Sequence, residues 1–152
     1  MDNTIAGGQA LELQILSRMA RITANPQMAG KIFQVCLDEA GITSITNSQD
    51  MMRFNQALSK QGEEFDKLSR SLMSDIMQSR LKQAINKLTK ALGKEKAELA
   101  VQECLKEINL STITSSQEMY KFALALIKRG GTVGVIGHSL KIQAILDGAE
   151  QD

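Results

Sequence analysis

Residues 36–62 read CLDEAGITSITNSQDMMRFNQALSKQG, and residues 104–130 read CLKEINLSTITSSQEMYKFALALIKRG. Aligned without a gap at an offset of 68, the two segments are identical at thirteen of twenty-seven positions. Average residue usage would give roughly two identities by chance. The identical pairs are Cys36/Cys104, Leu37/Leu105, Glu39/Glu107, Ile45/Ile113, Thr46/Thr114, Ser48/Ser116, Gln49/Gln117, Met51/Met119, Phe54/Phe122, Ala57/Ala125, Leu58/Leu126, Lys60/Lys128 and Gly62/Gly130. The alignment predicts an internal duplication of one module.

Turn-forming residues divide the first copy into helices. We expect a first helix over about residues 9–24, ending at Asn25-Pro26, and a second that ends near residue 40, before Gly41. Residues 42–46 form a short β-branched connection, which is the one place where a strand would fit. With one proline, no tryptophan and 3% aromatic residues, the composition favours helices elsewhere.

The third helix of each copy begins at a capping motif, for which the sequence offers two registers. In either register a polar side chain accepts hydrogen bonds from free backbone N–H groups at the start of the helix. The first register uses Thr46 with Gln49 and Thr114 with Gln117, and the second uses Asn47 with Asp50 and Ser115 with Glu118.

A long helix is predicted over about residues 63–92. Its apolar positions follow one helical face up to Ile76 and resume from Leu81 on a face rotated by about 140°. We interpret the rotation as the boundary between modules. The remaining helices are expected over about residues 94–109, 115–129 and 131–148.

The predicted fold class is therefore all-α: a helical bundle made by tandem duplication of a three-to-four-helix module, with a long central helix joining the halves. Residues 1–8 form an N-terminal tail, residues 9–76 the first module and residues 77–149 the second. We expect the two modules to make one compact domain with pseudo-twofold or tandem-repeat symmetry.

Charge, cysteine usage and hydropathy narrow the setting of the protein, although local charged patches can still bind a partner. A net charge of +1 gives no global field for nucleic acid or an anionic membrane. Cys36 and Cys104 lack metal-ligand spacing and favour a reducing compartment, so we expect a cytoplasmic protein. The first residues lack the features of a signal peptide, and the longest apolar run, residues 122–127, is far shorter than the ~20 residues of a membrane span. We predict no cofactor and no metal.

The glycine-rich stretch RGGTVGVIGHS, residues 129–139, has two interpretations. As a phosphate-binding loop it lacks the Gly-Lys-Ser/Thr ending and the preceding strand that such loops need. As a helix it places Gly130, Gly134 and Gly137 at i, i+4 and i+7, where they form a face without side chains. We favour this candidate helix-contact face, in contact with the same chain or with a partner.

For His138, Cys36 and Cys104 we compare a catalytic or redox role with a purely structural one. His138, the only histidine, is followed by Ser139 but lacks the second glycine of a nucleophile elbow, so we expect it on an exposed polar face. Cys36 and Cys104 lie among apolar neighbours, which favours core packing over redox or nucleophilic roles. No catalytic residue is predicted.

A basic stripe is the candidate partner-binding site. Between Lys67 and Lys94 the chain has seven basic residues and one acid, Asp75. Four of the basic residues fall within about 80° of helix circumference. They are Arg80, Lys87, Lys90 and Lys94. A solvated face, an acidic protein surface and nucleic-acid phosphates are the alternatives for this stripe, and the scarcity of aromatic residues disfavours base stacking.

These features predict a non-enzymatic helical module that binds proteins or regulates them, and that associates with itself as a homo-oligomer. The alternative is a nucleic-acid-associated protein that uses the basic stripe. A further alternative is a small-ligand carrier or an enzyme with a pocket between helices.

Overall fold

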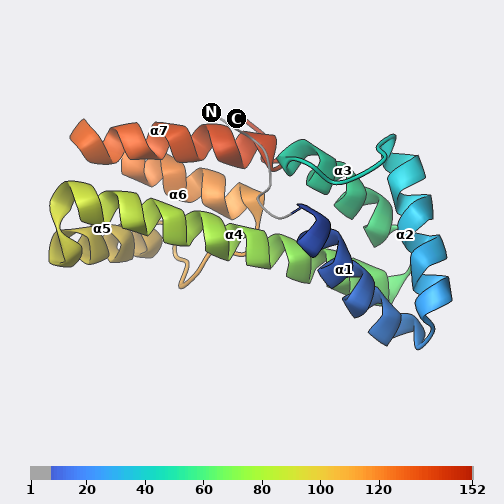
Figure 1. The fold of residues 1–152 in the computed structure, drawn as a ribbon. Helices are drawn as coiled ribbons and strands as arrows, with labels where there is room; N and C mark the ends of the chain where they lie inside the picture. Colours follow the sequence, from blue (N-terminus) through green and yellow to red (C-terminus); the bar gives the residue numbers. More distant parts are fainter. Residues whose placement is uncertain (1–7, 152) are drawn as a thin grey trace. The chain divides into compact units, whose positions relative to one another are not determined.

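The computed structural model describes residues 8–151, which form seven helices (Figure 1). In chain order these are α1 Gly8–Thr23, α2 Pro26–Ala40, α3 Ser48–Ser59, α4 Glu63–Leu92, α5 Lys94–Glu107, α6 Ser116–Arg129 and α7 Gly131–Leu146. Residues 8–151 contain no β-strand, and residues 42–46 are an irregular connection. The predicted all-α class is confirmed. The predicted tail lies outside the described residues apart from Gly8, where α1 begins.

Helix starts recur at the offset of 68 residues. Helices α2, α3 and α4 begin at residues 26, 48 and 63, and helices α5, α6 and α7 begin at residues 94, 116 and 131. Large side chains that are at most 1% exposed recur at the same offset: Ile45/Ile113, Met51/Met119, Phe54/Phe122 and Leu58/Leu126. The two halves therefore share their helix order and these buried positions.

The chain divides into two compact units between Leu72 and Met73, four residues before the predicted module boundary. Helix α4 continues through this division, so residues 63–72 belong to the first unit and residues 73–92 to the second. That the two modules make one compact domain stays a prediction, and each unit is described by itself.

In the first unit, α2 packs against both α1 and α3. Asn25 caps α2 by accepting hydrogen bonds from the backbone N–H groups of Gln27 and Met28, and Pro26 occupies the first turn, where no N–H is needed. Gly41 ends the helix at φ 71°, a left-handed conformation that glycine adopts without strain. The ring centroids of Phe33 and Phe54 lie 5.0 Å apart and join α2 to α3.

Asn55 is a polar residue inside this core. It lies on the buried side of α3 and is 5% exposed. Neither Oδ1 nor Nδ2 of its side chain has a hydrogen-bond partner among the described residues. Its backbone oxygen accepts a hydrogen bond from the Ser69 hydroxyl at 3.1 Å, which ties α3 to α4. The position 68 residues later is Ala123, a buried apolar residue.

Asn55→Leu is expected to raise the free energy of unfolding by about 2 kcal/mol, because leucine has the same branched outline and removes two unsatisfied polar atoms. Urea unfolding followed by circular dichroism measures the change. Asn55→Asp is the control and should destabilise the protein, because it buries a charge at the same place. A loss of stability in the leucine variant would contradict this account.

In the second unit, α5 packs against α6 and α6 packs against α7, while the second part of α4 supplies a further row of core residues. The buried cluster includes Met77, Leu81 and Leu88 from α4, Val101 and Cys104 from α5, Met119, Phe122 and Leu126 from α6, and Leu140 and Ala144 from α7. Met77 and Leu88 are inaccessible to solvent. The apolar residues on both sides of the predicted boundary are therefore core positions.

The structure selects the second of the two capping registers in both units. In the first unit the Asn47 side chain accepts a hydrogen bond from the Asp50 N–H, and the Asp50 carboxylate returns to the N–H and hydroxyl of Thr46. The same arrangement in the second unit uses three residues, which are Ser115, Glu118 and Thr114. In both units the carboxylate accepts hydrogen bonds from the threonine that precedes the cap residue. Thr46 and Thr114 are therefore hydrogen-bond donors and not the caps.

Glu118→Gln is expected to cost about 1 kcal/mol at neutral pH, because the carboxylate accepts two hydrogen bonds from Thr114, both at 2.9 Å. These hydrogen bonds lower the pKa of Glu118 below its ordinary value. The folded state therefore gains stability above the unfolded pKa and loses it as the pH falls through the lowered folded value. Urea unfolding at a series of pH values should show the two proteins converge in acid, whereas Glu98→Gln, at an exposed position of α5, should show no such convergence.

Candidate interaction surface

Two glycines connect α6 to α7. Gly130 ends α6 and caps α7 at φ 68°, and Gly131 follows at φ 57°. A Cβ atom on Gly130 would meet nothing within 4 Å. Gly130 is therefore part of the turn between α6 and α7, because its backbone is not helical. It does not belong to the predicted helix-contact face.

Gly134 and Gly137 face α6 from within α7, so their side of the helix is used inside the same chain. A Cβ atom on Gly137 would lie 2.9 Å from the backbone oxygen of Ala123 and 2.9 Å from the backbone nitrogen of Ile127. On Gly134 it would lie 3.4 Å from the backbone oxygen of Ile127, an ordinary contact. The lack of side chains lets the two helices approach closely, as Figure 1 shows for the adjacent α6 and α7.

An ion pair fixes the other end of α7. Asp147, just after the helix, is 3% exposed at its side chain, and its carboxylate lies 3.3 Å from Nε of Arg80 on α4. Nη2 of Arg80 reaches the second carboxylate oxygen at 3.4 Å, and Nε2 of Gln143 donates to that oxygen at 3.4 Å. A carboxylate is unfavourable both at a helix C-terminus and in a buried place. The guanidinium of Arg80 offsets both costs for Asp147.

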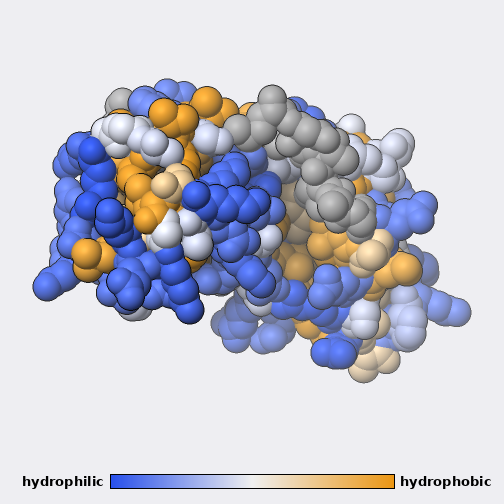
Figure 2. All heavy atoms as spheres, turned by 60° about the vertical axis from the view of Figure 1, so that its left-hand side comes forward, coloured by the Kyte–Doolittle hydropathy of each residue, from blue (hydrophilic) through white to orange (hydrophobic). Residues whose placement is uncertain are grey.

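The outer face of α7 carries two exposed apolar side chains, beside the exposed His138. We use this name for the side of the helix that carries Val135 and Ile142, which are 68% and 53% exposed. At the upper left of Figure 2, hydrophobic residues of the surface stand among hydrophilic ones. Lys141 is the single Lys, Arg, Asp or Glu of this helix, and its Nζ lies 6.0 Å from the ring centroid of Tyr120 on α6. Its charge is therefore directed to the side, away from Val135 and Ile142.

The predicted basic stripe is divided by the structure. Arg80 is held by Asp147 and its side chain is 21% exposed. Lys94 begins α5, after Gly93 at φ 88° has ended α4, so its direction does not follow from the helical phase of α4. Lys87 and Lys90 remain together as exposed residues of α4, with no carboxylate within 4.0 Å in residues 8–151.

Both cysteines are inaccessible core residues, one in each unit. Burial raises the pKa of the Cys36 thiol to about 11, with a smaller contribution from the charge of Glu39. Burial is also the largest cause of the raised pKa of Cys104. Because the thiolate is the reactive form, these environments oppose the nucleophilic and redox roles that were weighed against packing.

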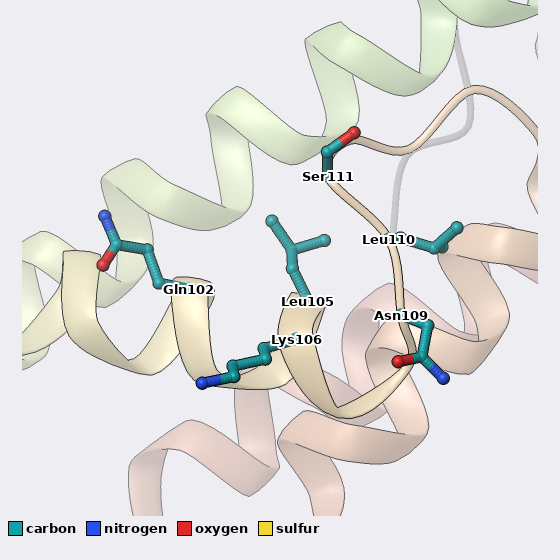
Figure 3. Close-up of a pocket in the computed structure, with 6 residues that line it drawn as sticks. All are labelled: Gln102, Leu105, Lys106, Asn109, Leu110 and Ser111. Carbon is teal, nitrogen blue, oxygen red and sulfur yellow. The ribbon is translucent and has the colours of Figure 1, made fainter.

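The second unit has an open depression of about 410 Å³ beside the C-terminal end of α5 (Figure 3). Leu105 and Leu110 supply its apolar lining, and Gln102, Lys106, Asn109 and Ser111 supply polar groups. In Figure 3 the side chains of Lys106 and Asn109 point away from Leu105 and do not converge with it on one point. The described residues contain no group of three or more His, Cys, Asp or Glu side chains suited to a metal ion.

His138 lies on α7 and is exposed, and the glycine-rich stretch around it is helical from Gly131 onward. This is the conformation that the offset of 68 residues predicts, since residues 63–72 are also helical. The phosphate-loop interpretation is therefore wrong, because no strand precedes the helix within the described chain.

Comparisons with models of protein families, with curated proteins and with solved structures find no match to this chain. Within residues 8–151, no helix combines the length and the hydropathy that crossing a bilayer requires.

The sequence interpretation missed two features of this surface. The outer face of α7 could have been found, since a sixteen-residue helix with one charged residue is unusual for a helix with a solvent-exposed side. The ion pair of Arg80 and Asp147 joins residues 67 positions apart and has no local signal.

Proposed function

We propose that this chain is a non-enzymatic helical protein-binding module and that the outer face of α7 is its binding surface. This proposal depends on the exposure of Val135 and Ile142. They lie on the side of α7 opposite Gly137, which packs closely against α6. Exposed apolar side chains on one helical face are a common feature of protein-interaction sites.

The corresponding position of the first unit provides a contrast. Val135 is offset by 68 residues from Lys67, whose side chain is 64% exposed and lies 3.4 Å from a carboxylate oxygen of Glu64. Lys67 is thus a solvated, charged residue, as expected on a helix that faces water. An apolar residue at the matching place of α7 is favoured where another protein covers the helix.

A tandem duplication is part of this proposal. The recurring helix starts, the paired buried residues and the two equivalent capping arrangements support it. After duplication, one copy of the module can keep a solvated helix while the other changes its outer face. The two reduced, buried cysteines support a cytoplasmic setting, where disulfides are rare.

Site-specific photo-crosslinking tests the proposed surface. A photo-reactive amino acid replaces Val135 in the full chain, and the protein is irradiated in the cells that produce it. The matched control carries the same group at Leu99, an exposed residue of α5. We expect a discrete crosslinked protein from position 135 and none from position 99. Absence of a crosslink at both positions, or equal crosslinking at both, would exclude the outer face of α7 as a specific binding surface.

Nucleic-acid binding is the second candidate, favoured by the exposed ammonium groups of Lys87 and Lys90. Retention on DNA or RNA would have to fall steeply with salt, since each phosphate contact releases counterions. The double variant Lys87→Gln/Lys90→Gln should then lose retention, with Lys60→Gln/Lys128→Gln as an exposed control pair of equal charge change. No retention of the unaltered protein at low salt would remove this candidate.

A further inference from the structure

We propose that Asn55 is a conformational device that lets the first unit open, and water reach its core, while the second unit stays folded. The observation behind this proposal is the pair of unsatisfied amide atoms inside the first unit. The opening is independent of the proposed function, because it involves the core of the first unit and not the outer face of α7.

The Asn55 amide favours an open state of the first unit. In the folded unit, Oδ1 and Nδ2 of Asn55 lack hydrogen-bond partners among the described residues, although the residue is only 5% exposed. When α3 separates from its neighbours, water can form hydrogen bonds with both atoms, so opening recovers the free energy that their burial costs. The corresponding residue of the second unit is Ala123, which has no polar side-chain atom to satisfy.

A glycine in α2 adds to the difference between the units. Gly30 lies inside the helix, and a Cβ atom at this position would meet nothing within 4 Å. No close approach requires this glycine, so its effect is to lower the helix propensity of α2. At the offset of 68 residues the second unit has Glu98, a better helix former.

The second unit has contacts between its helices that oppose opening. The close approach of α7 to α6 at Gly137 offsets the low helix propensity of the glycines in α7. Arg80 pairs with the buried carboxylate of Asp147 and thereby joins α4 to the end of α7. The side chain of Gln117 on α6 accepts a hydrogen bond from the Glu150 N–H at 3.0 Å and donates one to its carbonyl oxygen at 3.3 Å. Separation of α7 from α6 would break these contacts.

One buried cysteine in each unit makes the opening measurable. Cys36 on α2 and Cys104 on α5 are both inaccessible to solvent. Iodoacetamide alkylates a thiolate, whose sulfur displaces iodide, only after the surrounding helices have separated. When closing is faster than alkylation, the rate at each cysteine is proportional to the open fraction of its own unit.

The first expected result is a difference between the two cysteines of the unaltered protein. Peptide mass spectrometry follows the alkylation of each one under native conditions, and the rates in urea-unfolded protein correct for the intrinsic reactivity of each thiol. We expect Cys36 to react about tenfold faster than Cys104 or more, because one unsatisfied buried amide costs enough free energy for such a factor.

Substitutions in each unit assign the opening to Asn55. Asn55→Leu should slow the alkylation of Cys36 about 30-fold, which is ~2 kcal/mol at tenfold per about 1.4 kcal/mol, and leave Cys104 unchanged. Gly137→Ala should do the converse and speed the alkylation of Cys104 alone, because it overpacks the second unit. Asn86→Leu makes the same exchange at an exposed position of α4 and should alter neither rate.

Other results would overturn the proposal. Equal corrected rates at Cys36 and Cys104 would mean that the two units open together, and a faster reaction of Cys104 would make the second unit the weaker one. If Cys36 reacts as fast in the Asn55→Leu variant as in the unaltered protein, Asn55 does not control the opening. None of these outcomes bears on the crosslinking result at position 135, so the opening and the proposed function stand or fall separately.

Discussion

Replacing Gly137 with alanine is expected to lower the free energy of unfolding of the second unit by about 3 kcal/mol, a cost typical of overpacking at the upper end of its range. The new Cβ atom would lie 2.8 Å from Cβ of Leu126 and 2.9 Å from two backbone atoms of α6. Backbone atoms cannot turn aside as the end of a flexible side chain does, so α7 would have to move away from α6. The helix propensity of alanine, worth about 1 kcal/mol over glycine, offsets only part of this cost.

Tyr120 makes the measurement specific, because it is the only tyrosine of the chain, which has no tryptophan. It is buried in the second unit, at 4% exposure, so its fluorescence during urea unfolding follows that unit. Gly134→Ala is the matched control in the same helix and should change stability by less than about 1 kcal/mol, because its contact is of ordinary length. Equal effects of the two substitutions would contradict the close approach at Gly137.

The second large effect is expected at the buried ion pair. Asp147→Asn should cost about 2 kcal/mol, because it leaves the guanidinium of Arg80 without its carboxylate while keeping the size of the side chain. We place the cost below that of a fully buried pair, since Arg80 is 21% exposed and water can reach part of it.

A double-mutant cycle measures the coupling. Arg80→Met and Asp147→Leu should each destabilise the second unit, whereas the double variant should regain most of the loss, because it removes both charges of the ion pair. Tyr120 fluorescence again reports the unfolding. If the losses in the double variant are additive, the two residues act independently and the ion pair contributes nothing to the free energy of unfolding.

The helices were predicted well because their signals are local. Asn25-Pro26 marks the end of α1 at Thr23 and the start of α2 at Pro26. Gly41 marks the end of α2 at Ala40. The capping motifs placed the starts of α3 and α6, although the choice between two registers required the hydrogen bonds themselves. Capping depends on a few neighbouring backbone groups, which the sequence displays directly.

The candidate site residues were predicted less well, because helical phase gives the side on which a residue lies but not what lies opposite. Arg80 shares a helical side with Lys87, and yet only Arg80 lies near the carboxylate of Asp147. Lys94 was placed on the stripe by continuing the phase of α4 across Gly93, where that helix ends. Gly130 was grouped with Gly134 and Gly137 by spacing, but its positive φ makes it part of a turn.

By itself, the sequence determined the all-α class, the order of the helices, their approximate ends and a part of the buried positions, because hydrophobic periodicity and capping act within a few residues. Only the tertiary structure decided that Gly134 and Gly137 face α6, that Asp147 holds Arg80, and that Val135 and Ile142 are left exposed. These are contacts between helices distant in the chain, and they depend on which faces meet when the helices pack.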